Sequence, residues 1–265
     1  MTQAKRVQAP TVEEIEARLR APSVRALRPA ILGGIGALAT ICRFRWTAEG
    51  FSSARAEDAP FILAANHASH ADTAAILGTL PGPVRRRTCV AAALDVFGAT
   101  TDRRTLPALR RECLQIVVAA GFHAFAFDRH GPPLRSVRTA SELLQRGWNL
   151  LLYPEGTRTR SGEMGQFKPG VGILARVSGR PVVPVHVAGG ETILPCGAFL
   201  PRNGHAVVRF GSPLRFQDGE SASSFTDRLR QRIGAMIPAP AVVETPAATP
   251  AGEASFAAIT RQRSA

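Results

Sequence analysis

The stretch NHASHAD, residues 66–72, directs the interpretation of this chain because it places a histidine and an aspartate five positions apart. Five residues of a regular helix advance by about 500°, so His67 and Asp72 cannot meet if both lie in the middle of one helix. His67 must therefore precede a helix, and Asp72 must lie in its first turn. In that arrangement the carboxylate orients the imidazole, which is then able to act as a general base.

Two simpler interpretations of this stretch stand beside the first. Ser69 and Asp72 can form a capping box at the start of a helix, in which case His67 is an ordinary turn residue. His70 lies in the same loop and is a second candidate base, although its spacing from Asp72 is short for an orienting contact. The motif alone does not decide among these interpretations.

Strands and helices are expected to alternate around this stretch. Apolar runs predict strands at residues 61–65, 88–93, 123–127, 148–153, 181–187 and 206–210. Periodic segments bounded by proline and glycine predict helices at residues 71–80, 107–118, 133–145, 171–177 and 225–237. The fold class predicted from this order is α/β, with a mostly parallel central sheet flanked by helices and the active groups at strand ends.

The N-terminal region predicts two helices. Residues 11–20 form a short helix that Thr11 can cap. The next apolar centre, residues 30–42, has arginines on both sides and is shorter than the ~20 residues that a spanning helix needs. We therefore expect it to lie in a membrane interface, and a buried core helix is the alternative. Glycines at positions 33, 34 and 36 weaken any helix there.

Three regions follow from this pattern. Residues 1–43 are predicted to be N-terminal helices that associate with the membrane, and residues 44–237 to be the catalytic domain. Residues 238–265 consist of Ala, Pro, Thr and Glu with scattered apolar residues. Such a composition cannot bury enough surface to offset the loss of chain entropy, so this tail is predicted to be disordered.

The net charge of +13 implies attraction to a polyanion, either nucleic acid or an anionic membrane surface. Aromatic residues make up only 6% and no RNA-binding signature is present, so the membrane is favoured and no nucleic acid is expected as a partner. The four cysteines include no CxxC pair, which argues against a zinc site and against a disulfide framework. With no recognisable signal peptide, we expect a peripheral or monotopic protein on the cytoplasmic face of the cell membrane.

Charged residues follow two of the predicted strands. Arg129 comes directly after the strand at residues 123–127, and its planar guanidinium group suits a phosphate, although a surface pair with Asp128 is the simpler alternative. Residues 153–158, YPEGTR, place Glu155 and Arg158 at the end of another strand. A turn would explain the proline and glycine of this segment but not the charges beside a buried strand end.

Lys168 lies just before the predicted helix at residues 171–177. Together with the first amides of that helix it could attract an anion. Alternatively, the Pro-Gly pair that follows it simply marks the start of the helix.

Together these segments resemble the four ordered motifs of the 1-acylglycerol-3-phosphate acyltransferase family and its glycerolipid acyltransferase relatives. The resemblance spans residues 44–214 and rests on the order and spacing of four blocks as well as on their residues. They are the HX4D block that starts at His67, the Asp-Arg block at Arg129, the Pro-Glu-Gly-Thr-Arg block at residues 154–158, and the Val-Pro-Val block at residues 183–185.

The resemblance implies a role for each block. His67 would be the catalytic base and Asp72 its orienter. The acceptor's phosphate and glycerol would be bound by residues of the second and third blocks, and Pro184 would help to shape the acyl-donor side. The implied acceptor-binding residues are Arg129, Glu155, Gly156, Thr157 and Arg158.

The implied reaction moves a fatty acyl group from acyl-CoA or acyl-carrier protein to the free hydroxyl of a lysophospholipid. The first candidate acceptor is 1-acylglycerol-3-phosphate, which would give phosphatidate. No metal and no bound cofactor are expected. The alternatives are another lysolipid acceptor such as an aminolipid, a non-catalytic basic membrane-binding protein, and a hydrolase, for which the chain offers no Gly-x-Ser-x-Gly elbow.

Overall fold

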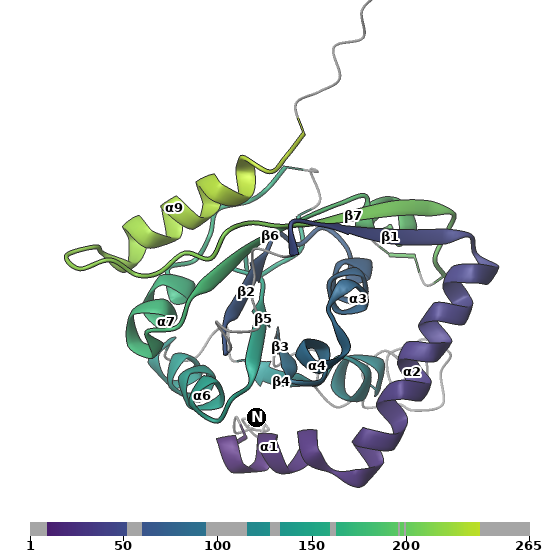
Figure 1. Cartoon of the computed structure of the whole chain (residues 1–265), viewed down its shortest axis with the longest axis horizontal. Helices are drawn as coiled ribbons and strands as arrows, with labels where there is room; N and C mark the ends of the chain where they lie inside the picture. Colours follow the sequence, from purple (N-terminus) through teal and green to yellow (C-terminus); the bar gives the residue numbers. More distant parts are fainter. Residues whose placement is uncertain are drawn as a thin grey trace, which may run out of the picture.

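The computed structural model describes residues 10–51, 60–93, 116–127, 133–159, 163–195, 197–198 and 200–238. They form a seven-stranded sheet with helices on both faces (Figure 1). The strands are β1 Phe44–Glu49, β2 Ile62–Ala65, β3 Thr88–Ala93, β4 Ala124–Phe127, β5 Asn149–Leu152, β6 Val182–Ala188 and β7 Gly204–Phe210. The helices are α1 Val12–Arg20, α2 Pro22–Ile41, α3 His70–Thr79, α4 Gly82–Arg86, η4 Val117–Gly121, α6 Pro133–Gln145, α7 Gly170–Ser178, α8 Gly190–Ile193 and α9 Ala222–Gly234.

The strand order is β1-β7-β6-β2-β5-β3-β4, and every neighbouring pair is parallel except β6 and β7. The prediction of an α/β fold with a mostly parallel sheet is therefore confirmed. Strand β2 lies at the centre, where Leu63 pairs with Leu151 of β5 and with Val183 of β6. The segments that follow β5 and β6 consequently flank the loop that follows β2.

The core has two layers, one on each face of the sheet. Successive residues of β2 point to opposite faces. Leu63 packs in the layer that contains α3, whereas Ile62 packs in the layer that contains α1, α6, α7 and α9. All four residues of β2 are buried, which is typical of a parallel sheet covered on both sides.

Most predicted elements begin and end within three residues of the observed bounds, and the predicted bounds of β3 and α6 are the same as the observed ones. Helix α9 begins at Ala222, before the predicted start at residue 225, because Ser221 caps it by accepting a hydrogen bond from the Ser224 amide at 3.0 Å. The predicted helix at residues 107–118 lies mostly outside the described residues, and so does the predicted tail from residue 239 onward.

Helix α1 packs into the core of the domain. Thr11 and Glu14 form the capping box at its start, and Ile15 and Leu19 are each only 1% exposed. The Arg18 guanidinium donates a hydrogen bond of 2.6 Å to the carbonyl oxygen of Ala124 in β4, which is an edge strand of the sheet. This helix therefore belongs to the same folded unit as the sheet.

Helix α2 is a 20-residue helix and is longer than the apolar centre at residues 30–42 suggested. Its only buried residue is Arg28, so it is not a buried core helix. By length and composition it could cross a membrane, and it is the one such helix in the described part of the chain. The three glycines of the apolar centre lie within the helix, and a Cβ atom added at any of them would have no neighbouring atom within 4 Å.

Arg28 attaches this helix to the domain. Its guanidinium donates to the carbonyl oxygens of Gly121 at 3.2 Å and Arg85 at 2.8 Å, and it lies 2.8 Å from Nδ1 of His123. Burial, with the nearby Arg28 charge as a second cause, lowers the pKa of His123 to about 3. His123 is therefore neutral and accepts a hydrogen bond from Arg28.

Candidate active site

The loop after β2 carries His67 and is held to β6 by Asn66. The side-chain Nδ2 of Asn66 donates to the carbonyl oxygen of Val187 at 2.9 Å, and its side-chain Oδ1 accepts from the backbone amide of Val187 at 2.7 Å. These two bonds take the place of strand pairing at the point where β2 has ended. The position of His67 is therefore set by the central strands of the sheet.

The structure brings His67 and Asp72 together. His67 precedes α3, Asp72 lies in the first turn of α3, and Nδ1 of His67 is 3.1 Å from Oδ2 of Asp72. The same oxygen accepts hydrogen bonds from the amides of Ala68 at 2.8 Å and Ser69 at 2.7 Å. Asp72 is 1% exposed, and three donors hold its carboxylate away from bulk solvent.

The capping box is also present, and it coexists with the histidine contact. Ser69 accepts a hydrogen bond from the Ala71 amide at 3.1 Å and donates one of 2.7 Å to the carbonyl oxygen of Leu194. Asp72 therefore both caps the helix and orients His67. The interpretation in which His67 is an unconnected turn residue is wrong.

The contact with Asp72 determines which nitrogen of His67 is able to accept a proton. Because Asp72 is an acceptor, Nδ1 carries the hydrogen and Nε2 carries the lone pair. Among the described residues, Nε2 has no hydrogen-bond partner, and the side chain of His67 is 15% exposed. This arrangement leaves Nε2 able to accept a proton.

Tyr153 packs against the other side of the site. Its ring stacks on the His67 imidazole with centroids 3.9 Å apart and an interplanar angle of 17°. The Tyr153 hydroxyl forms a hydrogen bond of 2.6 Å with Thr73 of α3, and burial raises the pKa of the phenol above its usual value. Sequence reasoning did not identify this contact, because β2 and β5 are neighbours only in the folded sheet.

Gly190 closes the side of Asp72 that faces away from His67. A Cβ atom at Gly190 would lie 2.0 Å from Oδ1 of Asp72, and that oxygen has no hydrogen-bond partner among the described residues. Any other residue at this position would displace the carboxylate. Gly190 follows β6, which explains why the sequence offered no sign of this contact.

Glu155, to which the resemblance assigns acceptor binding, faces the protein. It is 8% exposed, and its Oε1 accepts a hydrogen bond of 2.8 Å from the His67 amide. Arg129, the other residue of the predicted phosphate site, lies outside the described residues.

The remaining residues of the third block lie at the surface of the site. Gly156 has a φ of +74°, which favours glycine, and a Cβ there would lie 2.9 Å from Nζ of Lys168, so the lysine side chain passes close to this residue. Thr157 and Lys168 are exposed, and Arg158 is half-buried. Arg158 and Lys168 therefore place two positive charges beside the loop that carries His67.

His70, the alternative base, lies at the first position of α3. Its ring centroid is 6.4 Å from that of His67. Burial, followed by the charge of Arg158, lowers the pKa of His70 to about 4. His70 is therefore neutral at physiological pH.

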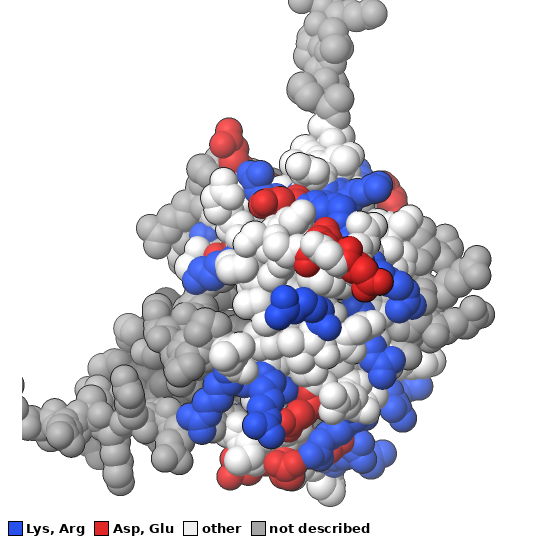
Figure 2. All heavy atoms as spheres, turned by 90° about the vertical axis from the view of Figure 1, so that its left-hand side faces the viewer, with Lys and Arg blue, Asp and Glu red and all other residues white. Residues whose placement is uncertain are grey.

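Positive charge on the face shown in Figure 2 lies in several separate groups, most with acidic side chains beside them. Ion pairs in the described part of the chain include Arg146 with Glu16 at 2.9 Å and Arg228 with Glu220 at 2.7 Å. An anion-binding role is therefore better supported at the loops around His67 than on this face.

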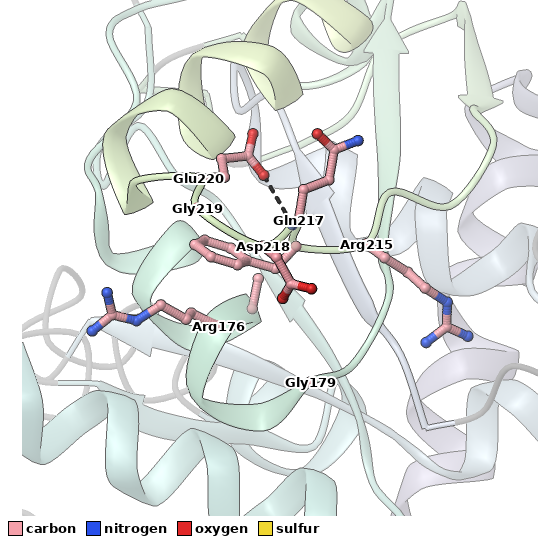
Figure 3. A pocket seen from close by; sticks show the side chains of 9 residues that line it. Arg176, Gly179, Arg215, Gln217, Asp218, Gly219 and Glu220 are labelled. Atoms are coloured by element: carbon pink, nitrogen blue, oxygen red, sulfur yellow. Dashed lines mark hydrogen bonds between the residues drawn. The ribbon is translucent and has the colours of Figure 1, made fainter.

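A hollow of about 520 Å³ lies elsewhere, between the end of α7 and the loop before α9 (Figure 3). The end of α7 leads into the start of β6, whereas His67 follows the end of β2. Because β2 and β6 are parallel, the hollow and His67 lie at opposite ends of these strands. The side chains of Arg176 and Arg215 at the hollow point away from each other. They form no shared cationic site there.

Comparison with known proteins finds relatives of this chain. The chain is 37% identical over 136 residues to the 1-acyl-sn-glycerol-3-phosphate acyltransferase of Pseudomonas aeruginosa, covering 49% of this chain and 52% of that protein. It is 24% identical over 198 residues to the chloroplastic 1-acyl-sn-glycerol-3-phosphate acyltransferase BAT2 of Brassica napus, covering 70% of this chain and 48% of that protein. The chain thus spans about half the length of these curated relatives.

Among solved structures, the chain is similar to the 1-acyl-sn-glycerophosphate acyltransferase PlsC from Thermotoga maritima. The TM-score is 0.60 at 21% identity, with 83% of this chain and 84% of that chain covered, which is a likeness of fold. A family model described as Acyltransferase matches residues 48–188, more than half of the chain, and this region contains His67, Asp72 and the block at residues 154–158. The chain therefore belongs to the acyltransferase family.

Proposed function

We propose that this protein transfers a fatty acyl group from acyl-CoA or acyl-carrier protein to the free hydroxyl of 1-acylglycerol-3-phosphate, giving phosphatidate. The observation that carries the proposal is the hydrogen bond between His67 and Asp72 at the end of a central strand, inside the region matched by the family. The names of the relatives support the choice of acceptor.

In the proposed reaction, Nε2 of His67 takes the proton of the acceptor hydroxyl as the hydroxyl oxygen attacks the carbonyl carbon of the thioester. The tetrahedral intermediate then collapses, the carbon–sulfur bond breaks, and the thiolate leaves with the proton from His67. Asp72 holds Nδ1–H throughout and stabilises the imidazolium. General base catalysis of this kind contributes about 10²- to 10⁴-fold, and positioning supplies much of the remainder.

The acceptor phosphate is assigned to the groups on the outer side of the loops. Arg158 and Lys168 supply positive charge, and the Thr157 hydroxyl lies in the same segment, whereas the Gly156 amide already donates to the carbonyl oxygen of Tyr153 at 3.0 Å. Arg129 is retained in this set from its place in the second block. A guanidinium group suits a phosphate because its planar fork donates two parallel hydrogen bonds. The step uses no bound metal or cofactor.

Helix α2 is assigned to the membrane surface, on the cytoplasmic face. Most of the helix is exposed, Ile41 is 76% exposed, and the exposed residues Arg25, Arg43 and Arg45 flank the apolar stretch. Each arginine near an anionic leaflet contributes about 1 kcal/mol to binding. Vesicle binding should therefore weaken as salt is added, and full solubility in the presence of anionic vesicles at low ionic strength would contradict the assignment.

An acceptor panel tests the proposal. The purified protein is given one labelled acyl-CoA, or the matching acyl-carrier protein, with lysophosphatidate, neutral lysolipids and a hydroxylated aminolipid, and the products are identified by mass. We expect labelled phosphatidate as the main product. Acyl transfer only to an acceptor without phosphate would overturn the choice of acceptor, and release of free fatty acid alone would indicate a hydrolase.

A further inference from the structure

The carboxylate of Glu155 is fully engaged by protein donors. Its Oε1 accepts the amide hydrogen of His67 at 2.8 Å, and its Oε2 accepts the amide hydrogen of Gly165 at 2.9 Å and the hydroxyl hydrogen of Thr159. The residue is 8% exposed. A carboxylate that is buried and bonded in this way has little surface left for a ligand, and its charge would repel an acceptor phosphate.

Thr159 bonds to the main-chain carbonyl oxygen of His67, whose amide bonds to Glu155. The Thr159 amide donates a hydrogen bond of 2.8 Å to the carbonyl oxygen of His67, while its hydroxyl bonds to Glu155. Both main-chain polar groups of His67 are therefore bonded to the loop that follows β5. The Cα atom of His67 lies between these two bonds, so they fix the direction in which the imidazole leaves the backbone.

This attachment complements the one made by Asn66. Asn66 joins the end of β2 to β6 on one side, and Glu155 with Thr159 joins His67 to the segment after β5 on the other. The imidazole direction matters because the ring must reach Asp72 and stack on Tyr153 at the same time. A displacement of the reacting group by about 1 Å can cost about 100-fold in rate.

We propose that Glu155 and Thr159 act as positioning residues that latch the backbone of His67, and that Glu155 does not bind the acceptor. The inference rests on the proposed function, in which His67 is the base. It revises the role that the family resemblance gave to Glu155, and it gives a role to Thr159, which lies just beyond the recognised block. The acceptor phosphate is then bound by Arg158 and Lys168.

Steady-state kinetics test the latch with the full-length protein and the variants Glu155→Gln and Thr159→Val. Each is expected to lower kcat by about 10-fold or more while the KM for lysophosphatidate changes by less than about 3-fold, because the latch acts on the base and not on acceptor binding. Thr159→Ser keeps the hydroxyl and should restore most of the rate. Thr79→Val is the matched control, since Thr79 also donates from its hydroxyl but at the far end of α3.

Two results would overturn the latch. One is a rise in KM with kcat unchanged in Glu155→Gln, which is the signature of an acceptor ligand. The other is a further loss of the residual rate when Glu155→Gln is added to His67→Ala, because a residue that acts only through the imidazole has nothing left to position.

Amide hydrogen exchange at His67 gives a readout that does not depend on turnover. The latch predicts faster exchange of the His67 amide in Glu155→Met, which removes both acceptor oxygens, than in wild type and Thr79→Val, with the far-ultraviolet circular dichroism of the variant unchanged. If Glu155→Met fails to fold, Thr159→Val serves the same test, because it removes the hydroxyl that holds the Glu155 carboxylate against the His67 amide. If wild type transfers no acyl group, the proposed function fails, whereas unchanged exchange at His67 refutes the latch itself.

Discussion

The imidazole of His67 and the phenol ring of Tyr153 lie almost parallel, with centroids 3.9 Å apart. The stack covers one face of the base, and the Tyr153 hydroxyl is tied to Thr73 at 2.6 Å. Tyr153, which follows β5, thereby links that segment to helix α3 beside His67. Orientation of His67 thus depends on packing as well as on its hydrogen bond to Asp72.

Substitutions at Tyr153 separate these contributions. Tyr153→Phe keeps the stacked ring and loses only the bond to Thr73, so we expect kcat to fall by less than about 10-fold, in line with the ~1 kcal/mol of one hydrogen bond. Tyr153→Leu removes the planar surface and should lower kcat by about 10-fold or more. Equal rates for the two variants at saturating acceptor would show that the stack has no effect.

Gly190→Ala should impair the reaction although Gly190 bears no chemical group. The added Cβ would lie 2.0 Å from Oδ1 of Asp72, so the carboxylate must move and its bond to His67 must lengthen. We expect kcat to fall by about 10-fold or more with a smaller change in the KM for the acceptor. Gly234→Ala is the control, because its Cβ would meet only Met164, at 3.7 Å. A Gly190→Ala enzyme as fast as this control would refute the close contact.

Arg28→Met should destabilise the folded protein. The substitution leaves the carbonyl oxygens of Gly121 and Arg85 and the ring of His123 without their buried donor. We expect the free energy of unfolding to fall by about 2–5 kcal/mol, measured by denaturant titration in mild detergent. The exposed Arg135→Met should stay within about 0.5 kcal/mol of wild type. Equal stability of the two variants would show that Arg28 does not anchor the helix.

Buried histidines predict a loss of stability in acid. The pKa of His123 is lowered to about 3 and that of His70 to about 4, both first by burial, whereas the unfolded chain has an ordinary histidine pKa near 6.5. The unfolded state therefore binds more protons below pH ~6.5. Stability is fully present above this pH and declines toward pH 4, by at most about 1.4 kcal/mol per pH unit for each histidine.

Unfolding measured at several pH values checks this slope. His123→Asn removes one titrating group while keeping a residue type that tolerates the positive φ of this position, so the slope between pH 6.5 and pH 4 should become shallower. The exposed His205→Gln should leave the slope unchanged. A slope in His123→Asn identical to that of wild type would contradict the burial of an uncharged His123.

Local signals in the sequence predicted much of the fold. Proline at the first position and Gly147 just beyond the last bound α6, and a continuous apolar run predicts β3. The apolar run alone underestimates the length of α2, because the sequence gives Arg28 the character of a flanking surface charge. Its partners are carbonyl oxygens at the ends of other elements, and such acceptors have no signature in the sequence.

The candidate site also combines contacts that the sequence predicts with contacts that it does not. His67 and Asp72 were predicted because their contact is local and because the helix start limits their geometry. The bonds from Glu155 to His67 and the approach of Gly190 to Asp72 join residues far apart in the chain. They depend on β5 and β6 being the neighbours of β2, and the sequence does not specify the order of strands within a parallel sheet.

The most direct test of the account compares wild type with His67→Ala and Asp72→Asn in the transfer of labelled acyl groups to lysophosphatidate. We predict phosphatidate formation by wild type, loss of about 100-fold or more of kcat in His67→Ala with its circular dichroism unchanged, and a marked loss in Asp72→Asn, which disturbs the tautomer of His67. Near-normal turnover by a folded His67→Ala enzyme would contradict the assignment of His67 as the catalytic base.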